Sequence, residues 1–146
     1  MRHQTRFLWL VRGQTLVEIV VVVGVVVLLV TGLVAGATAA LKSSQYGRAK
    51  SLSVKYVQEG VELARSIRDR SWDEFFSYNG KTWCVDQSAV WSDGTSGCTA
   101  NIGTYFTRTV TLAWNDPNMQ VDVSVSWIDG SRTLRSDVRT YLTKWQ

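Results

Sequence analysis

Residues 13–42 of the chain read GQTLVEIVVVVGVVVLLVTGLVAGATAALK, and the region from Ile19 to Leu41 contains no charged residue. A helix over these uncharged positions would extend for about 34 Å at a rise of 1.5 Å per residue. That length is sufficient to cross a hydrocarbon core of about 30 Å with modest tilt. The sequence therefore predicts one membrane-spanning helix near its N-terminus.

Valine dominates this apolar run, which would favour a strand in water. In lipid, an isolated strand leaves its backbone groups without hydrogen bonds, so a helix is predicted instead. Three arginines, Arg2, Arg6 and Arg12, precede the run, and the first charge after it is Lys42. This asymmetry predicts a cytoplasmic N-terminus and an exported C-terminal part. The net charge of +4 thus indicates membrane topology rather than a nucleic-acid partner.

A secretory signal peptide or a plain signal anchor would also explain an apolar run. Ala35-Gly36-Ala37 offers the small residues that a signal peptidase requires. The start of the run argues against cleavage there, because Gly13 precedes the run and Glu18 places a carboxylate within its first turns. A charge costs roughly 2.5–3.5 kcal/mol at mid-membrane and less near the interface. Glu18 is therefore expected to have a partner.

The stretch Gly13-Gln14-Thr15-Leu16-Val17-Glu18 resembles the class III leader junction of type IV pilins and pseudopilins. The resemblance implies that a prepilin peptidase cuts after Gly13 and that Gln14 becomes an N-methylated N-terminus. It also implies that Glu18 guides assembly. The amine of Gln14 in one subunit would neutralise Glu18 of its neighbour in an apolar core, where an unpaired charge is costly.

Two features differ from the usual pattern of that family. Gln14 stands where phenylalanine is most common, although glutamine is an accepted variant. The helix-bending proline of major pilins is missing, and Gly24, Gly32 and Gly36 occupy the stem instead. Glycines at these positions allow close helix contacts or local melting.

Beyond the apolar run the helix is expected to continue to about Arg70, because no proline occurs before Pro117. Apolar residues recur there near helical spacing and predict a stripe that packs on a sheet. The stripe comprises Leu52, Tyr56, Val61, Ala64 and Ile67, widened by Val54 and Val57.

Three strands with period-two alternation are predicted in the C-terminal part of the chain. Their inward faces are Phe106, Val110, Leu112 and Trp114, then Val121, Val123, Val125 and Trp127, then Leu134, Val138 and Leu142. The segments Asn115-Asp116-Pro117-Asn118 and Asp129-Gly130 supply the turns. Because each strand has one apolar face, an antiparallel sheet covered on one side is predicted. The fold class is α+β, with a pilin-like long N-terminal helix packed on this sheet.

The chain is thus predicted to comprise five segments. They are a cleaved leader (1–13), a transmembrane and filament-core helix (14–41), the amphipathic half of that helix (42–71), a loop region with the cysteine pair (72–103) and an antiparallel β-meander (104–146).

Cys84 and Cys98 flank a segment, residues 92–97, that is rich in turn-forming residues. Two cysteines without nearby histidines make at most half of a zinc site. In an exported domain a disulfide is expected, and closing a loop of about 15 residues would stabilise the fold by roughly 3 kcal/mol. The alternative is two separate, small core residues.

No catalytic constellation is found, so neither an enzyme nor a cofactor nor a metal site is expected. The predicted head has no histidine, no glycine-rich phosphate loop and no nucleophile near a plausible base. Asp73 and Glu74 are interpreted as a solvated helix exit rather than an acid/base pair.

The aromatic residues are the remaining candidates for function in the head. Trp83 and Trp91 flank the cysteine loop together with Tyr78 and Lys81. They are interpreted first as core and subunit packing. A surface that stacks on sugar, DNA or another subunit is the alternative.

Together these features predict a major or minor filament subunit that is anchored in the cytoplasmic membrane with its C-terminus outside. Its expected partners are other pilins, the prepilin peptidase and the membrane. No small-molecule substrate is expected, and nucleic acid is a weak alternative because no dense basic stripe accompanies the aromatic residues. After assembly the subunit would lie in an extracellular pilus or a periplasmic pseudopilus. A type II secretion pseudopilin and a stand-alone, signal-anchored surface binding module remain as alternatives.

Overall fold

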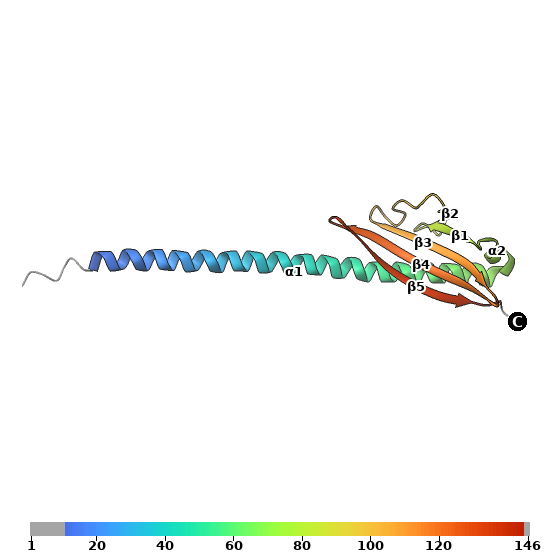
Figure 1. Cartoon of the computed structure of the whole chain (residues 1–146), viewed down its shortest axis with the longest axis horizontal. Coiled ribbons are helices and arrows are strands. Elements are labelled where there is room, and N and C mark those ends of the chain that lie inside the picture. Colours follow the sequence, from blue (N-terminus) through green and yellow to red (C-terminus); the bar gives the residue numbers. More distant parts are fainter. Residues whose placement is uncertain (1–10, 145–146) are drawn as a thin grey trace, which may run out of the picture. The chain divides into compact units, whose positions relative to one another are not determined.

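The computed structural model describes residues 11–144, with side chains from Thr15 onward. The predicted leader arginines Arg2 and Arg6 lie outside the described residues. The chain divides into two compact units, Met1–Gln45 and Tyr46–Gln146. Both contribute to one helix, α1, which comprises the 60 residues Val11–Arg70 (Figure 1).

The predicted end of the long helix near Arg70 is confirmed, and Ser71 explains it. Ser71 has an extended backbone with φ −158° and ψ 119°, and its side chain accepts a hydrogen bond from the Glu74 backbone N–H at 3.2 Å. A serine in this conformation caps the N-terminus of a new helix. That helix is α2, Trp72–Ser77, so the chain changes direction between the two helices at Ser71.

Five antiparallel strands form one sheet in the order β2-β1-β3-β4-β5 (Figure 1). Their bounds are β1, Lys81–Val85, β2, Trp91–Asp93, β3, Phe106–Asn115, β4, Asn118–Asp129, and β5, Arg132–Leu142. The α+β class with a long helix packed on an antiparallel sheet is therefore confirmed. The predicted Asp129-Gly130 hairpin turn is also present, with Gly130 at φ 61°, a backbone conformation that favours glycine.

The region 72–103, predicted as a loop region with the cysteine pair, also contains short elements that the sequence did not reveal. This region contains α2, β1 and β2, which are six, five and three residues long. Elements this short show little hydrophobic periodicity, so their sequences do not reveal them. Tertiary pairing defines the strands instead, since β1 pairs with β3 through Trp83 opposite Val110.

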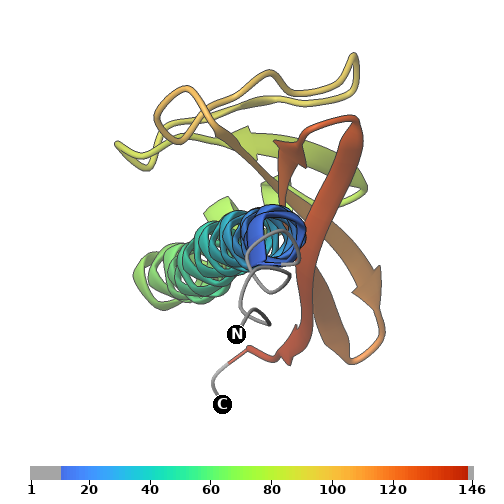
Figure 2. The same cartoon turned by 90° about the vertical axis from the view of Figure 1, so that its left-hand side faces the viewer.

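The part of α1 within the second unit packs on one face of the sheet (Figure 2). Ser53, Gly60 and Ala64 lie along the centre of the buried stripe, between larger apolar side chains such as Val57. A Cβ atom added at Gly60 would lie 2.7 Å from Cγ1 of Val123. Small residues on this line therefore allow the helix backbone to approach the sheet closely.

The predicted apolar faces are correct in β4 and need correction elsewhere. Val54, Trp114 and Val138 were expected to face inward but expose 41%, 38% and 42% of their surface. Val54 lies about 100° around the helix from Ser53 and so falls at the margin of the stripe. Trp114 lies at the end of β3 and contacts α2, and Val138 belongs to the edge strand β5.

The edge strand β5 has a contact with α1 through a lysine. The Lys50 ammonium donates to the Ser136 hydroxyl at 2.9 Å and to the Arg135 carbonyl at 3.4 Å. The exposed residues Arg135, Asp137 and Arg139 alternate along the strand with Ser136 and Val138.

Candidate assembly segment and head-domain site

Within α1, one segment is long and apolar enough to cross a membrane, as judged by length and composition. Its apolar side chains are exposed, with Leu28 and Leu33 each at 74%. Its threonines satisfy their hydroxyls locally. Thr31 donates to the Val27 carbonyl at 2.7 Å, and Thr38 donates to the Ala35 carbonyl at 2.9 Å. Internal bonding of this kind leaves a surface that suits an apolar environment.

The predicted processing junction lies at the start of this helix. Gly13 and Gln14 belong to the first turn of α1, and the Gln14 side chain lies outside the described residues. Glu18 follows one turn later and is exposed. Between residues 15 and 144, nothing forms a hydrogen bond or an ion pair with its carboxylate.

The predicted disulfide is present between Cys84 of β1 and Cys98, with 5.6 Å between their Cα atoms. Gly94 lies against it, since a Cβ atom there would be 3.1 Å from each sulfur and 2.9 Å from the Thr82 carbonyl oxygen. The glycine therefore allows the loop after β2 to fold onto the bond. The disulfide closes a loop with a sequence separation of 14.

The aromatic residues predicted to flank the cysteine loop form one cluster. The ring of Tyr78 lies 4.8 Å from that of Trp83 and 5.1 Å from that of Trp91, centroid to centroid. The Trp83 indole N–H donates to the Tyr78 carbonyl at 2.9 Å, and the Lys81 ammonium lies 5.8 Å from the Trp83 ring centroid. Such tilted ring contacts fix the orientation of each side chain.

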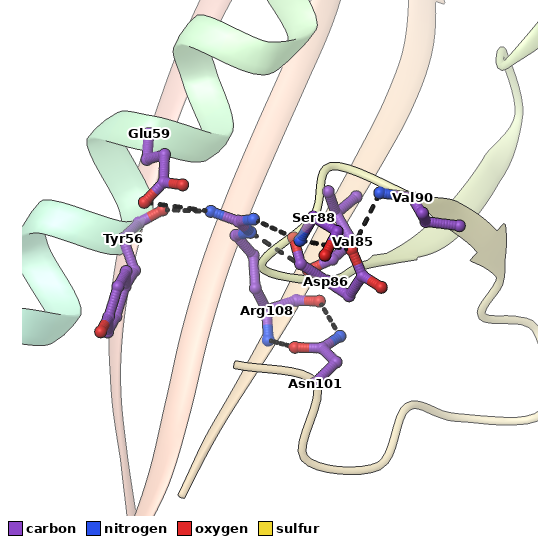
Figure 3. A network of polar contacts seen from close by, with 8 residues as sticks. All are labelled: Tyr56, Glu59, Val85, Asp86, Ser88, Val90, Asn101 and Arg108. Carbon is purple, nitrogen blue, oxygen red and sulfur yellow. Dashed lines mark hydrogen bonds and ion pairs between the residues drawn. The ribbon is translucent and has the colours of Figure 1, made fainter. Parts of the chain in front are cut away.

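A buried arginine, which the sequence analysis missed, connects α1 with the β1–β2 turn (Figure 3). Arg108 of β3 has an exposed fraction of 0%. Its guanidinium donates to the Val85 and Asp86 carbonyls on one side and to the Tyr56 carbonyl of α1 on the other. Burial lowers the pKa of Arg108 from its usual value, while the carboxylates of Glu59 and Asp86 oppose this shift.

The backbone of Arg108 is held as well. Its N–H donates to the Asn101 side-chain oxygen at 2.7 Å, and the Asn101 amide donates back to the Arg108 carbonyl at 2.8 Å. In the sequence, Arg108 occupies an inward position of β3 between Phe106 and Val110. A charged residue in phase with an apolar face was the signal that would have identified it.

Asp86 organises the turn that Arg108 holds. One oxygen of its carboxylate accepts hydrogen bonds from the Ser88 and Val90 backbone N–H groups at 2.8 and 2.9 Å (Figure 3). The turn includes Ala89 at φ 62°, in the left-handed region that non-glycine residues rarely adopt. Hydrogen bonds on both sides of Ala89 maintain this conformation.

Two further carboxylates, those of Glu74 and Asp93, form local contacts. Glu74 pairs with Arg70 at 3.1 Å. Asp93 accepts from the Thr95 hydroxyl and N–H, and these bonds lower the pKa of its carboxyl. Across the described part of the chain, no group of three or more histidine, cysteine, aspartate or glutamate residues could hold a metal ion. Comparisons with known protein families, with curated proteins and with solved structures find no match.

Proposed function

We propose that the chain is a type IV pilin-like subunit, anchored in the cytoplasmic membrane, processed after Gly13 and polymerised into a surface filament through α1. One observation carries the proposal: the junction 13–18 lies on the same helix as the exposed apolar segment that follows it. A helix of this composition needs an apolar environment along its whole surface. Lipid supplies that environment before assembly, and the α1 helices of neighbouring subunits supply it afterwards.

Glu18 sets the register in which neighbouring subunits align during assembly. Its carboxylate is exposed at the start of the apolar segment, where a charge without a partner is costly. The new amine of Gln14 in a neighbouring subunit would neutralise it in the filament core. Breaking a buried pair of this kind typically costs about 3–5 kcal/mol, so a subunit in the wrong register would be disfavoured.

The mass of the mature chain tests processing directly. We expect the purified protein to begin at Gln14 and to carry one added methyl group. A Gly13→Leu variant should retain residues 1–13, while a Gly24→Leu variant, which leaves the junction unchanged, should be cut normally. An intact Met1 in the mature wild-type protein would contradict the proposal and favour a signal-anchored module.

Glu18→Ala tests assembly separately from processing. Membrane insertion should be unaffected, because the apolar segment is unchanged, whereas filament yield should fall strongly because the Gln14 amine loses its partner. Glu18→Asp keeps the charge and serves as the matched control. Normal filaments in Glu18→Ala, seen by electron microscopy of sheared cell surfaces, would refute the pairing.

A type II secretion pseudopilin would share this N-terminal half and behave alike in both experiments. The location of the polymer separates the two assignments. Extracellular filaments on cells expressing the protein at its native level support a pilin, and an exclusively periplasmic polymer supports a pseudopilin.

A further inference from the structure

A cavity of about 290 Å³ lies beside the aromatic cluster. Ser66, Ile67 and Arg70 of α1 form one wall, and Tyr78 and Trp91 contribute to the other. Its volume lies just below the range of about 300–1,000 Å³ that is usual for small-molecule sites. We propose that this cavity binds the terminal residue of an acidic saccharide, a sugar ring that carries a carboxylate.

The aromatic wall suits the body of such a ligand. Tyr78 and Trp91 have ring centroids 5.1 Å apart, and both side chains are half-buried. Rings with one apolar face and one polar edge bind groups that are themselves part apolar and part polar. A pyranose ring has this character, because its C–H faces are apolar and its rim carries hydroxyls. The Ser66 hydroxyl provides a donor and an acceptor for that rim.

Arg70 supplies the selectivity for a carboxylate. It carries the only formal charge among the residues that line the cavity. Its present partner, Glu74, accepts one hydrogen bond at 3.1 Å, and the two side chains are 65% and 40% exposed. Exposed pairs of this type contribute little free energy, so a ligand carboxylate can replace Glu74. A planar guanidinium binds a carboxylate through two parallel hydrogen bonds.

Arg108 positions the wall that carries Trp91. Its guanidinium holds the Asp86 carbonyl, and the Asp86 carboxylate holds the turn that leads into β2 (Figure 3). A buried guanidinium is costly unless it is hydrogen-bonded, and Arg108 donates to carbonyls of both α1 and the β1–β2 turn. An apolar residue at this position would leave those carbonyls unpaired and would not hold the turn against α1. Arg108 is therefore a positioning residue for the cavity.

The cavity lies within the unit Tyr46–Gln146, so this inference does not depend on the assembly of α1 into a filament. Failure of saccharide binding would leave the proposed filament function intact. Conversely, a chain that never assembles would retain the cavity.

Binding is tested with the full chain in detergent micelles by saturation-transfer difference NMR. The ligands are glucuronate, galacturonate and N-acetylneuraminate, with glucose and galactose as neutral counterparts. We expect the acidic sugars to bind at least about tenfold more tightly than the neutral ones, as expected for a charge-assisted bidentate contact. Absence of binding by all three acidic sugars, or equal binding of the neutral sugars, would overturn the proposal.

Variants localise the site. Arg70→Gln should weaken glucuronate binding by about tenfold or more, and Arg70→Lys should retain part of it. Arg65→Gln is the matched control, because Arg65 is also an exposed α1 arginine in an ion pair, with Glu62, but does not line the cavity. Unchanged binding in Arg70→Gln would refute the site. For Arg108→Met, a folded protein with wild-type affinity would exclude the positioning role.

Discussion

Gly60 of α1 lies against Val123 of β4 so closely that a Cβ atom at Gly60 would be 2.7 Å from the valine Cγ1. The same atom would lie 3.2 Å from Cδ of Arg108. The close approach of helix and sheet at Gly60 therefore coincides with the buried arginine. Both neighbours belong to the packed interior, where displacement disturbs further contacts.

Gly60→Ala should destabilise the head by about 1–3 kcal/mol, because the added methyl group overpacks the interface. Gly47→Ala is the control on the same helix, since a Cβ atom there meets nothing within 4 Å. That substitution should stabilise α1 by roughly 0.5–1 kcal/mol through the helix propensity of alanine. Urea unfolding monitored by tryptophan fluorescence measures both changes, and equal effects of the two substitutions would contradict the close approach.

Arg108→Met should cost about 1–3 kcal/mol for each carbonyl that is left unpaired in the interior, principally those of Val85 and Asp86. Amide hydrogen exchange should quicken at Ser88 and Val90, because the turn loses its anchor. Arg139→Met provides the comparison, since Arg139 forms an exposed pair with Asp122 and should change stability by less than about 1 kcal/mol. Unaltered exchange in the turn would show that Arg108 does not hold it.

Removal of the disulfide should lower stability by roughly 3 kcal/mol, as expected for a closed loop of this length. The double variant Cys84→Ser, Cys98→Ser should show this loss in a urea titration. Reductant should destabilise the wild-type protein to a similar extent and should leave the double variant unaffected. A wild-type midpoint that is insensitive to complete reduction would contradict the expectation.

Asp93 should contribute to a stability that depends on pH. Its pKa is lowered mainly by hydrogen bonds from Thr95, so the ionised form is favoured in the folded state. The contribution is therefore complete above about pH 4 and is lost as the pH falls through the lower, folded-state pKa. In an NMR titration, Thr95→Val should raise the Asp93 pKa. Ser92→Ala, in β2 three residues before Thr95, should not, because the Ser92 hydroxyl donates to the Cys84 carbonyl and not to Asp93.

The principal elements were predictable because each has a strong periodic signal. Val121, Val123 and Val125 alternate without interruption in β4, and all three are fully buried. The helix stripe was placed slightly off centre because its middle contains Ser53 and Gly60, which a search for apolar residues passes over. The short packing distance between helix and sheet, not hydrophobicity, determines which residue types fit at those two positions.

The candidate cavity and its support were less predictable. The sequence already grouped Trp83, Trp91 and Tyr78 around the cysteine loop, and the structure adds that the Tyr78 ring contacts both indoles. Arg70 and Arg108 join this region only through tertiary contacts. No pattern along the chain connects Arg108 to the Asp86 carbonyl, because that contact depends on β1 pairing with β3.

The charges at the edge strand β5 have a consequence for crowding. Lys50 reaches the edge strand β5, and Arg135, Asp137 and Arg139 place alternating charges along it. Strand margins with lysine and closely spaced charges resist uncontrolled pairing with other strands. Wherever many copies of the head gather at high local concentration, this margin would keep them soluble and separate, without aggregation into a continuous intermolecular sheet.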